Sequence, residues 1–195
     1  MKKILTIVIL LIVTLCVALS IASAKREAQI VTTAETIADG DWLCFHKEFT
    51  MLWPGDAELK IAADTKYWLW INESLVVFEG GLKRGPTPHD TYYDVVNLAP
   101  YLSKGRNEVR VLLWHFGKPG FSHVNSGKSG FILQAPAIDL YTDYTWQSQR
   151  LNCYQTADNP LPNWRLAESN IRYDARLEQQ ADWKNSLEIG VWGDH

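Results

Sequence analysis

The chain has 195 residues, a formal net charge of −3, and nine Trp and eight Tyr residues. It lacks the clustered Lys and Arg that bind phosphates, so its composition argues against a nucleic-acid-binding protein. Trp and Tyr either fill a β-sandwich core or offer flat surfaces with a polar edge to sugar rings. The composition leaves both interpretations of the aromatic residues open.

Residues 1–24 are expected to be a targeting segment. Lys2 and Lys3 precede an apolar run over residues 4–21, and Ala22-Ser23-Ala24 has the small-residue pattern of a cleavage site. Cleavage there predicts an exported protein, periplasmic or extracellular. The apolar run exceeds the roughly 7–15 residues of an ordinary signal peptide. A membrane anchor formed by residues 4–21 is therefore the alternative, since about 18 apolar residues begin to span a bilayer.

Alternation of apolar and polar residues with a period of two predicts β-strands through the middle of the chain. In chain order the expected strands cover residues 43–50, 58–61, 67–72, 109–114, 131–134 and 151–155. Asp64-Thr65 and Asn72-Glu73 suit hairpin turns. The predicted fold is all-β, a jelly-roll or galactose-binding-like β-sandwich over residues 41–156. Residues 25–40 are expected to be a linker, and residues 157–195 a linker and irregular tail.

Two long loops interrupt this strand pattern, over residues 80–90 and 118–129. Glycine and proline exclude regular structure from the first loop, which must cross one end of the sandwich. Loops held by a rigid scaffold often carry binding residues, and this one offers Arg84 and His89 to sugar hydroxyl groups. An ordinary solvated crossover is the alternative.

The central stretch also carries a family-like pattern of spaced residues. Its members are Ala63-Asp64, Tyr67, Leu69, Ile71-Asn72, Gly85-Pro86, Tyr93-Asp94, Leu98, Tyr101-Leu102, Gly105 and Asn107-Glu108-Val109. This pattern resembles the jelly-roll domains attached to bacterial glycoside hydrolases. A second motif, residues 173–178 followed by Trp183, is similar to the segment after the first sandwich domain of bacterial α-L-rhamnosidases. The chain departs from the family at Glu73 and Asp182, where Gly is usual.

Together the two motifs resemble an N-terminal, non-catalytic region of the α-L-rhamnosidase family over residues 42–183. The resemblance implies a carbohydrate-binding or accessory domain that acts on or near rhamnose-containing glycans. The helical barrel that carries the family's catalytic acids has no counterpart in this sequence, so the chain is not expected to be a glycosidase by itself. The alternative is a truncated or split-gene fragment whose role is to pack against a separate catalytic domain or chain.

Sugar-binding candidates fall on two predicted surfaces. One is a strand face with Trp68 and Trp70, and the other is a loop end with Arg84, His89, Tyr92 and Trp114. The leading candidates are Trp70, Arg84, His89, Tyr92 and Trp114.

Other chemistry finds little support in the sequence. The five His residues lack metal-ligand spacing, and no serine lies in a nucleophile-elbow motif. No cofactor is expected, although sandwich domains can hold a structural calcium ion through carboxylate and carbonyl oxygens. Cys44 and Cys153 lie at opposite ends of the sandwich sequence. In an exported chain they would form either a disulfide or two buried thiols.

Overall fold

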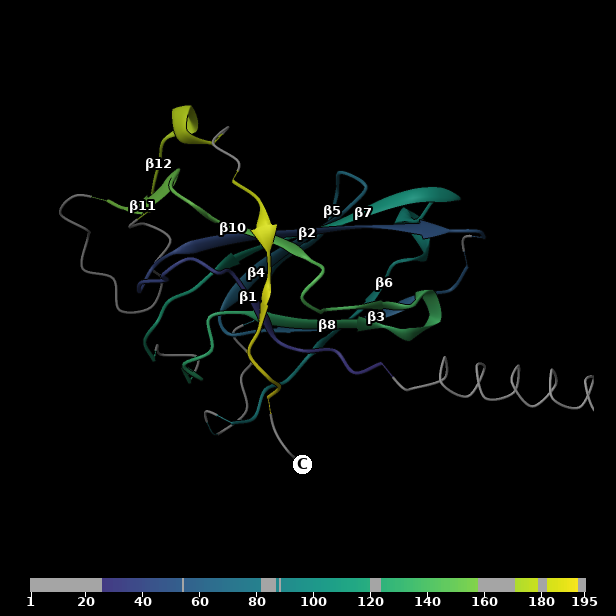
Figure 1. Ribbon diagram of the computed structural model, residues 1–195, viewed down its shortest axis with the longest axis horizontal. Helices are drawn as coiled ribbons and strands as arrows, with labels where there is room; N and C mark the ends of the chain where they lie inside the picture. The colour runs from purple at the N-terminus through teal and green to yellow at the C-terminus, as the bar shows by residue number, and fades with distance from the viewer. Residues whose placement is uncertain are drawn as a thin grey trace, which may run out of the picture.

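The fold is described here from a computed structural model. The structure describes residues 26–53, 55–81, 87, 89–119, 124–157, 171–178 and 182–192. In this part of the chain two antiparallel sheets stack as two layers, with a separate hairpin beside them (Figure 1). The predicted all-β sandwich is therefore confirmed. The predicted targeting segment lies outside the described residues, and no helix within them is long and apolar enough to cross a membrane.

The first layer, called the β3–β8 sheet, has the strand order β14-β1-β8-β3-β6, with β9 paired to β8. Its strands are β1 (Val31–Thr32), β3 (Glu58–Ala63), β6 (Asp94–Asn97), β8 (Phe131–Ala135), β9 (Leu140–Tyr141) and β14 (Leu187–Glu188). The second layer, called the β2–β7 sheet, has the order β13-β10-β2-β7-β4-β5. Its strands are β2 (Trp42–Met51), β4 (Lys66–Ile71), β5 (Ser74–Gly81), β7 (Gly105–Trp114), β10 (Gln147–Leu151) and β13 (Lys184–Asn185).

The separate hairpin pairs β11 (Tyr154–Thr156) with β12 (Ile171–Tyr173). Short 3₁₀ turns occur at η1 (Ala99–Tyr101), η2 (Pro136–Ile138) and η4 (Ala175–Leu177). The first of these lies between β6 and β7. The strand expected over residues 151–155 is instead split between β10 and β11, because the chain bends at Asn152 and Cys153.

The core lies between the two sheets and follows the predicted alternation. Along β7, Val109, Val111 and Leu113 are fully buried, while Arg110 between them is exposed. The inner faces of the other strands bury, among others, Leu43, Phe45, Leu59, Ile61, Leu69, Ile71, Phe131 and Leu133. Because side chains alternate across a strand, the residues between them must point to the outer faces. Those outer faces are where a binding surface can form.

Segments expected to be linker and tail contribute strands to both sheets. In the region of residues 25–40, β1 joins β8, and in the tail β14 pairs with β1 while β13 pairs with β10. Ser186 is buried between the two tail strands, and its backbone N–H donates to the carbonyl of Trp146 at 2.8 Å. Strands of two residues are too short to show a period of two, which is why the sequence pattern did not reveal them.

Candidate groove and aromatic stack

A groove of about 530 Å³ lies on the outer face of the β3–β8 sheet. Its floor comes from paired strands, because Lys60 pairs with Gln134 and Ala62 pairs with Ile132. Leu59, Ile61, Phe131 and Leu133 are buried in the core. Because side chains alternate along a strand, the groove residues Lys60, Ala62, Ile132 and Gln134 point away from the core. The groove floor therefore forms because both strands of this pair place alternate residues on the outer face of the sheet.

The sides of the groove come from segments far apart in the sequence. Residues 26–28 lie near the start of the described chain, Thr91 and Tyr93 precede β6, and Val191 and Trp192 follow β14. Tyr93 is 55% exposed, and the Lys60 ammonium lies 5.0 Å from the centre of its ring. Arg26 donates to Asp139 at 3.0 Å, and both side chains are exposed.

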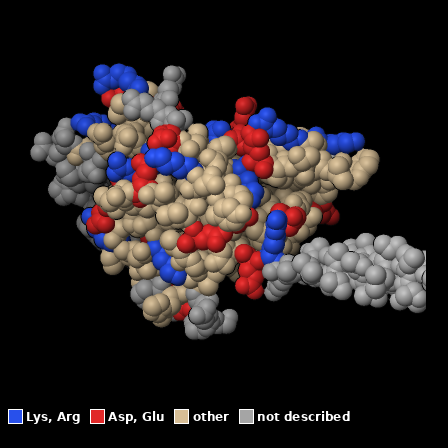
Figure 2. Space-filling view, in the orientation of Figure 1, with Lys and Arg blue, Asp and Glu red and all other residues tan. Residues whose placement is uncertain are grey.

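This combination of groups suits a small polar ligand. Tyr93 and Trp192 supply aromatic surface, while Lys60, Thr91, Gln134 and Glu27 supply hydrogen-bonding groups of both kinds. Ligand sites commonly combine a mostly apolar or aromatic lining with a few polar groups that fix orientation. Acidic and basic side chains are intermixed on the face seen in Figure 2, without a large area of one sign.

A second aromatic feature lies on the outer face of the other sheet. Trp42 stacks on Trp114, Trp68 and Tyr154, with ring centres 4.8, 5.3 and 4.4 Å apart. Trp42 and Trp114 are only 4% and 6% exposed. Tyr154 comes from the β11–β12 hairpin, and Tyr173 of the same hairpin lies 5.0 Å from Tyr154. We call these five residues the aromatic stack. Its centre is buried and acts as a small second core.

The four sequence-predicted sugar-binding residues that the structure describes lie in two different parts of the sandwich. Trp114 of β7 is in the aromatic stack, and Trp70 of β4 is half-buried on the outer face of the same sheet. His89 and Tyr92 are exposed in the segment before β6, where Tyr92 is next to the groove residue Tyr93. Arg84 lies outside the described residues. Trp114 was expected at a loop end, but it ends β7 and packs against Trp42.

Sequence reasoning missed the groove residues Lys60, Tyr93, Gln134 and Trp192. A signal for two of them was present, because Lys60 and Gln134 occupy the outward positions of strands recognised by their period of two. Nothing local in the sequence shows that Trp192 lies beside these strands, since the tail reaches them through pairing between β14 and β1.

Cys44 and Cys153 are free, buried thiols in the structure. The disulfide considered for this pair is therefore not formed, and the alternative of two buried thiols describes the structure. Burial raises the pKa of Cys44 to about 12 and also raises the pKa of Cys153. Among the described residues no group of three or more His, Cys, Asp and Glu could hold a metal ion. A structural calcium ion stays an untested prediction.

The fold and the groove define a β-sandwich domain with a ligand-sized depression on one sheet. No protein-family model and no curated protein sequence matches the chain. Among solved structures it is similar to a GH78 family rhamnosidase of Bacillus sp. GL1, with a TM-score of 0.64 and 24% identity over 86% of this chain. It is also similar to an α-L-rhamnosidase from Aspergillus terreus, with a TM-score of 0.59 and 18% identity over 85% of this chain.

The chain spans only 19% and 21% of those two rhamnosidases. These structural similarities, at sequence identities this low, show a shared fold alone. They confirm, at the level of fold, the resemblance between this chain and a sandwich region of rhamnosidases.

Proposed function

We propose that this chain is a carbohydrate-binding accessory domain of a rhamnosidase-like glycoside hydrolase and does not itself cleave glycosidic bonds. The observation that carries the proposal is the groove over β3 and β8, with Tyr93 beside Lys60 and Gln134. The sandwich fold shared with two rhamnosidases supports a saccharide as the ligand, with rhamnose-containing glycans as the first class to test. The targeting segment predicted over residues 1–24 is consistent with an exported protein that meets such glycans outside the cytoplasm.

Tryptophan fluorescence provides the test, because Trp192 lies in the groove. The segment 25–195 contains the whole described sandwich and would be titrated with rhamnose and rhamnose-containing oligosaccharides. We expect a saturable change, and a Tyr93→Ala variant that binds at least about tenfold more weakly, equivalent to about 1.4 kcal/mol. Lys60→Met should also weaken binding, because it removes a hydrogen-bond donor while keeping a similar chain length.

Phe78→Ala is the matched control. Phe78 is an aromatic residue that is 69% exposed, but it belongs to β5 at the edge of the other sheet. This variant should bind like the parent protein. Binding that survives Tyr93→Ala but is lost in Phe78→Ala would place the saccharide on the β2–β7 sheet and contradict the proposal.

A purely structural role in packing against a catalytic domain or chain is the second candidate. It is favoured by the short span of the chain relative to the rhamnosidases and by exposed apolar residues on β5. Leu75 and Phe78 are 46% and 69% exposed on this edge strand, and exposed apolar patches often mark interaction sites. A flat titration by a folded protein, checked by circular dichroism, would support this role over saccharide binding.

A further inference from the structure

Three polar side chains meet where strands β3, β7 and β8 end or begin. Asp64 follows β3, His115 follows β7, and Ser129 lies two residues before β8. The Nδ1 atom of His115 is 3.3 Å from Oδ2 of Asp64, and its Nε2 atom is 3.0 Å from Oγ of Ser129. The imidazole therefore lies between a carboxylate and a hydroxyl group, with a different ring nitrogen facing each.

The neighbouring carboxylate decides which ring nitrogen of His115 is expected to carry the proton. Nδ1 of His115 and Oδ2 of Asp64 are in close polar contact, but their arrangement does not meet the geometry of a hydrogen bond. A negative carboxylate at this distance still favours the His115 proton on the nearer nitrogen, Nδ1. The Nε2 atom then carries a lone pair and accepts from the Ser129 hydroxyl. This is the order of groups that lets a histidine remove a proton from a serine that attacks a carbonyl carbon.

Other hydrogen bonds hold the first two members in place. Oδ1 of Asp64 accepts from the hydroxyl and from the backbone N–H of Ser126, the latter at 3.2 Å. The backbone N–H of His115 donates to the carbonyl of Asp41 at 2.9 Å. Asp64 is fully buried, the His115 side chain is 7% exposed, and Ser129 is partly exposed. Ser129 is thus the most exposed of the three residues.

We propose that Ser129, His115 and Asp64 form a hydrolytic site for small O-acyl esters. Oγ of Ser129 would attack the ester carbonyl while its proton passes to Nε2 of His115. The bond from the carbonyl carbon to the alkoxy oxygen then breaks, and that oxygen leaves as the alcohol with the proton from His115. Water, deprotonated by His115 in the same way, attacks the acyl-serine and releases the carboxylic acid and the free serine.

The position of this site suggests which esters reach it. Lys60 and Ala62 of the groove lie just before Asp64 on β3, and Ile132 of the groove lies just after Ser129 on β8. The ammonium group of Lys128 also donates to the carbonyl of Val191, which lines the groove. Because Ser129 itself does not line the groove, the substrate class we assign is an acyl ester on a saccharide that extends beyond the groove. This assignment rests on the proposed saccharide binding, whereas the ester chemistry does not.

The first test uses p-nitrophenyl acetate and a fluorophosphonate probe on the segment 25–195. We expect turnover above the buffer rate and a single adduct on the peptide that contains Ser129. Ser129→Ala should abolish the adduct, and His115→Asn should slow turnover by about 10²–10⁴-fold, the usual contribution of a general base. An unlabelled Ser129 in the folded parent protein would overturn the proposal.

Ser126→Ala is the matched control, because Ser126 lies in the same loop and also hydrogen-bonds to Asp64. If the cluster only anchors the loop, both serine variants should lose stability and neither serine should be labelled. If the proposal is right, the label falls on Ser129 and not on Ser126, and Ser126→Ala slows the labelling of Ser129 because Asp64 loses a hydrogen bond. Turnover that is equal in Ser129→Ala and the parent protein would also contradict it.

The ester site and the groove can fail separately. Ser129→Ala should bind saccharides like the parent protein, because Ser129 does not line the groove. Labelling of Ser129 without saccharide binding would keep the ester site and remove the proposed function. Saccharide binding without labelling of Ser129 would keep the proposed function and remove the ester site.

Discussion

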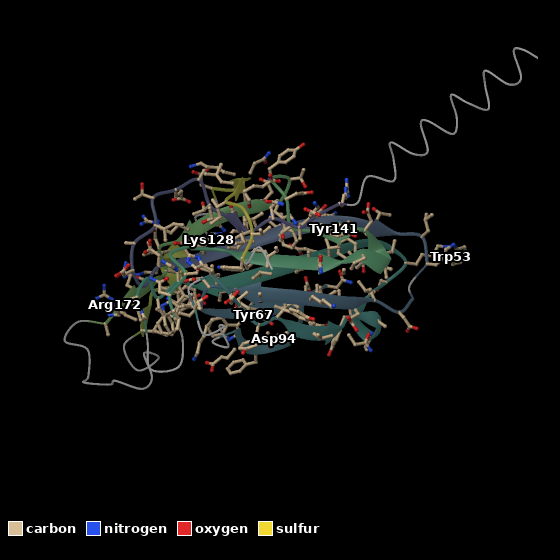
Figure 3. The ribbon with its side chains drawn as sticks, turned by 90° about the horizontal axis from the view of Figure 1, so that it is seen from below. Trp53, Tyr67, Asp94, Lys128, Tyr141 and Arg172 are labelled. Carbon is tan, nitrogen blue, oxygen red and sulfur yellow. The ribbon has the colours of Figure 1, made fainter. Side chains whose placement is uncertain are left out.

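Tyr67 and Asp94 connect the two sheets of the sandwich through a hydrogen bond of 2.8 Å from Oη of Tyr67 to Oδ2 of Asp94 (Figure 3). Tyr67 belongs to β4 in the β2–β7 sheet, and Asp94 begins β6 in the β3–β8 sheet. The same carboxylate oxygen accepts from the backbone N–H of Gly81 at 3.2 Å. Burial and the hydrogen bond to Asp94 raise the pKa of Tyr67, so its hydroxyl stays protonated as the donor.

Replacing Tyr67 with Phe should lower the free energy of unfolding by about 1.5–3 kcal/mol, the usual contribution of a hydrogen bond to a charged group. The ring remains to fill the core, so the loss isolates the hydroxyl. Urea unfolding followed by circular dichroism measures the change. Asp94→Asn keeps an acceptor and should cost less, and a Tyr67→Phe protein as stable as the parent would contradict this role for the hydrogen bond.

Gly80 lies opposite Tyr67 in the strand pair of β4 and β5. A Cβ atom at this position would lie 2.3 Å from Cζ of Tyr67, whereas one at Gly55 would have no neighbour within 4 Å. Overpacking of this kind typically costs about 1–3 kcal/mol. We therefore expect Gly80→Ala to reduce the urea midpoint clearly and Gly55→Ala to leave it almost unchanged. Similar midpoints for the two variants would show that the Tyr67 ring moves without cost.

The aromatic stack should contribute to stability as a core does. Trp42 is 4% exposed and contacts three rings, so Trp42→Ala should destabilise the protein by about 3–5 kcal/mol. Phe78, which is 69% exposed, is the control and should change stability by less than about 1 kcal/mol on replacement by Ala. Thermal unfolding of both variants would show whether the stack is structural, as we infer, or dispensable.

Asp143 should make stability depend on pH in the acid range. Burial by itself would raise its pKa, but hydrogen bonds from Thr145 and from Lys47 outweigh burial and lower it. The Lys47 ammonium lies 3.0 Å from the carboxylate. A lowered pKa in the folded state adds stability above the ordinary pKa of about 4, and this stability is lost as the pH falls through the folded value.

Asp143→Asn should therefore reduce stability at neutral pH and flatten its dependence on pH below about 4. Lys47→Met should act in the same direction, because it removes one of the groups that lower the pKa. Urea midpoints measured across this range test both. Equal slopes in the parent protein and Asp143→Asn would show that other carboxyl groups control acid unfolding.

The two cysteines of the segment 25–195 should be unreactive while the protein is folded. Burial raises the pKa of Cys44 to about 12, and the thiolate is the reactive form. A thiol reagent at pH 8 should therefore detect the two thiols only after denaturant is added. If none appears even in denaturant, the two residues form the disulfide that the sequence left open.

Much of the sandwich could be predicted because the inward face of a strand can be recognised from the alternation of residues within that strand alone. The period of two around Val109, Val111 and Leu113 identifies β7 without knowledge of its partners, and the same holds for β4 around Tyr67 and Leu69. The candidate site could not be predicted in this way. Trp114 follows the same alternation as the rest of β7, and only its stacking on Trp42 shows that it is unavailable to a ligand.

The sequence by itself determined the fold class, because alternating apolar side chains can be buried only by strands that pack face to face. It also determined the resemblance to a rhamnosidase sandwich region. Only the tertiary structure decided that Trp192 joins Lys60 and Tyr93 at one groove, and that His115 lies between Asp64 and Ser129. These residues come from distant segments, and antiparallel pairing between those segments, which no local pattern encodes, determines which side chains meet.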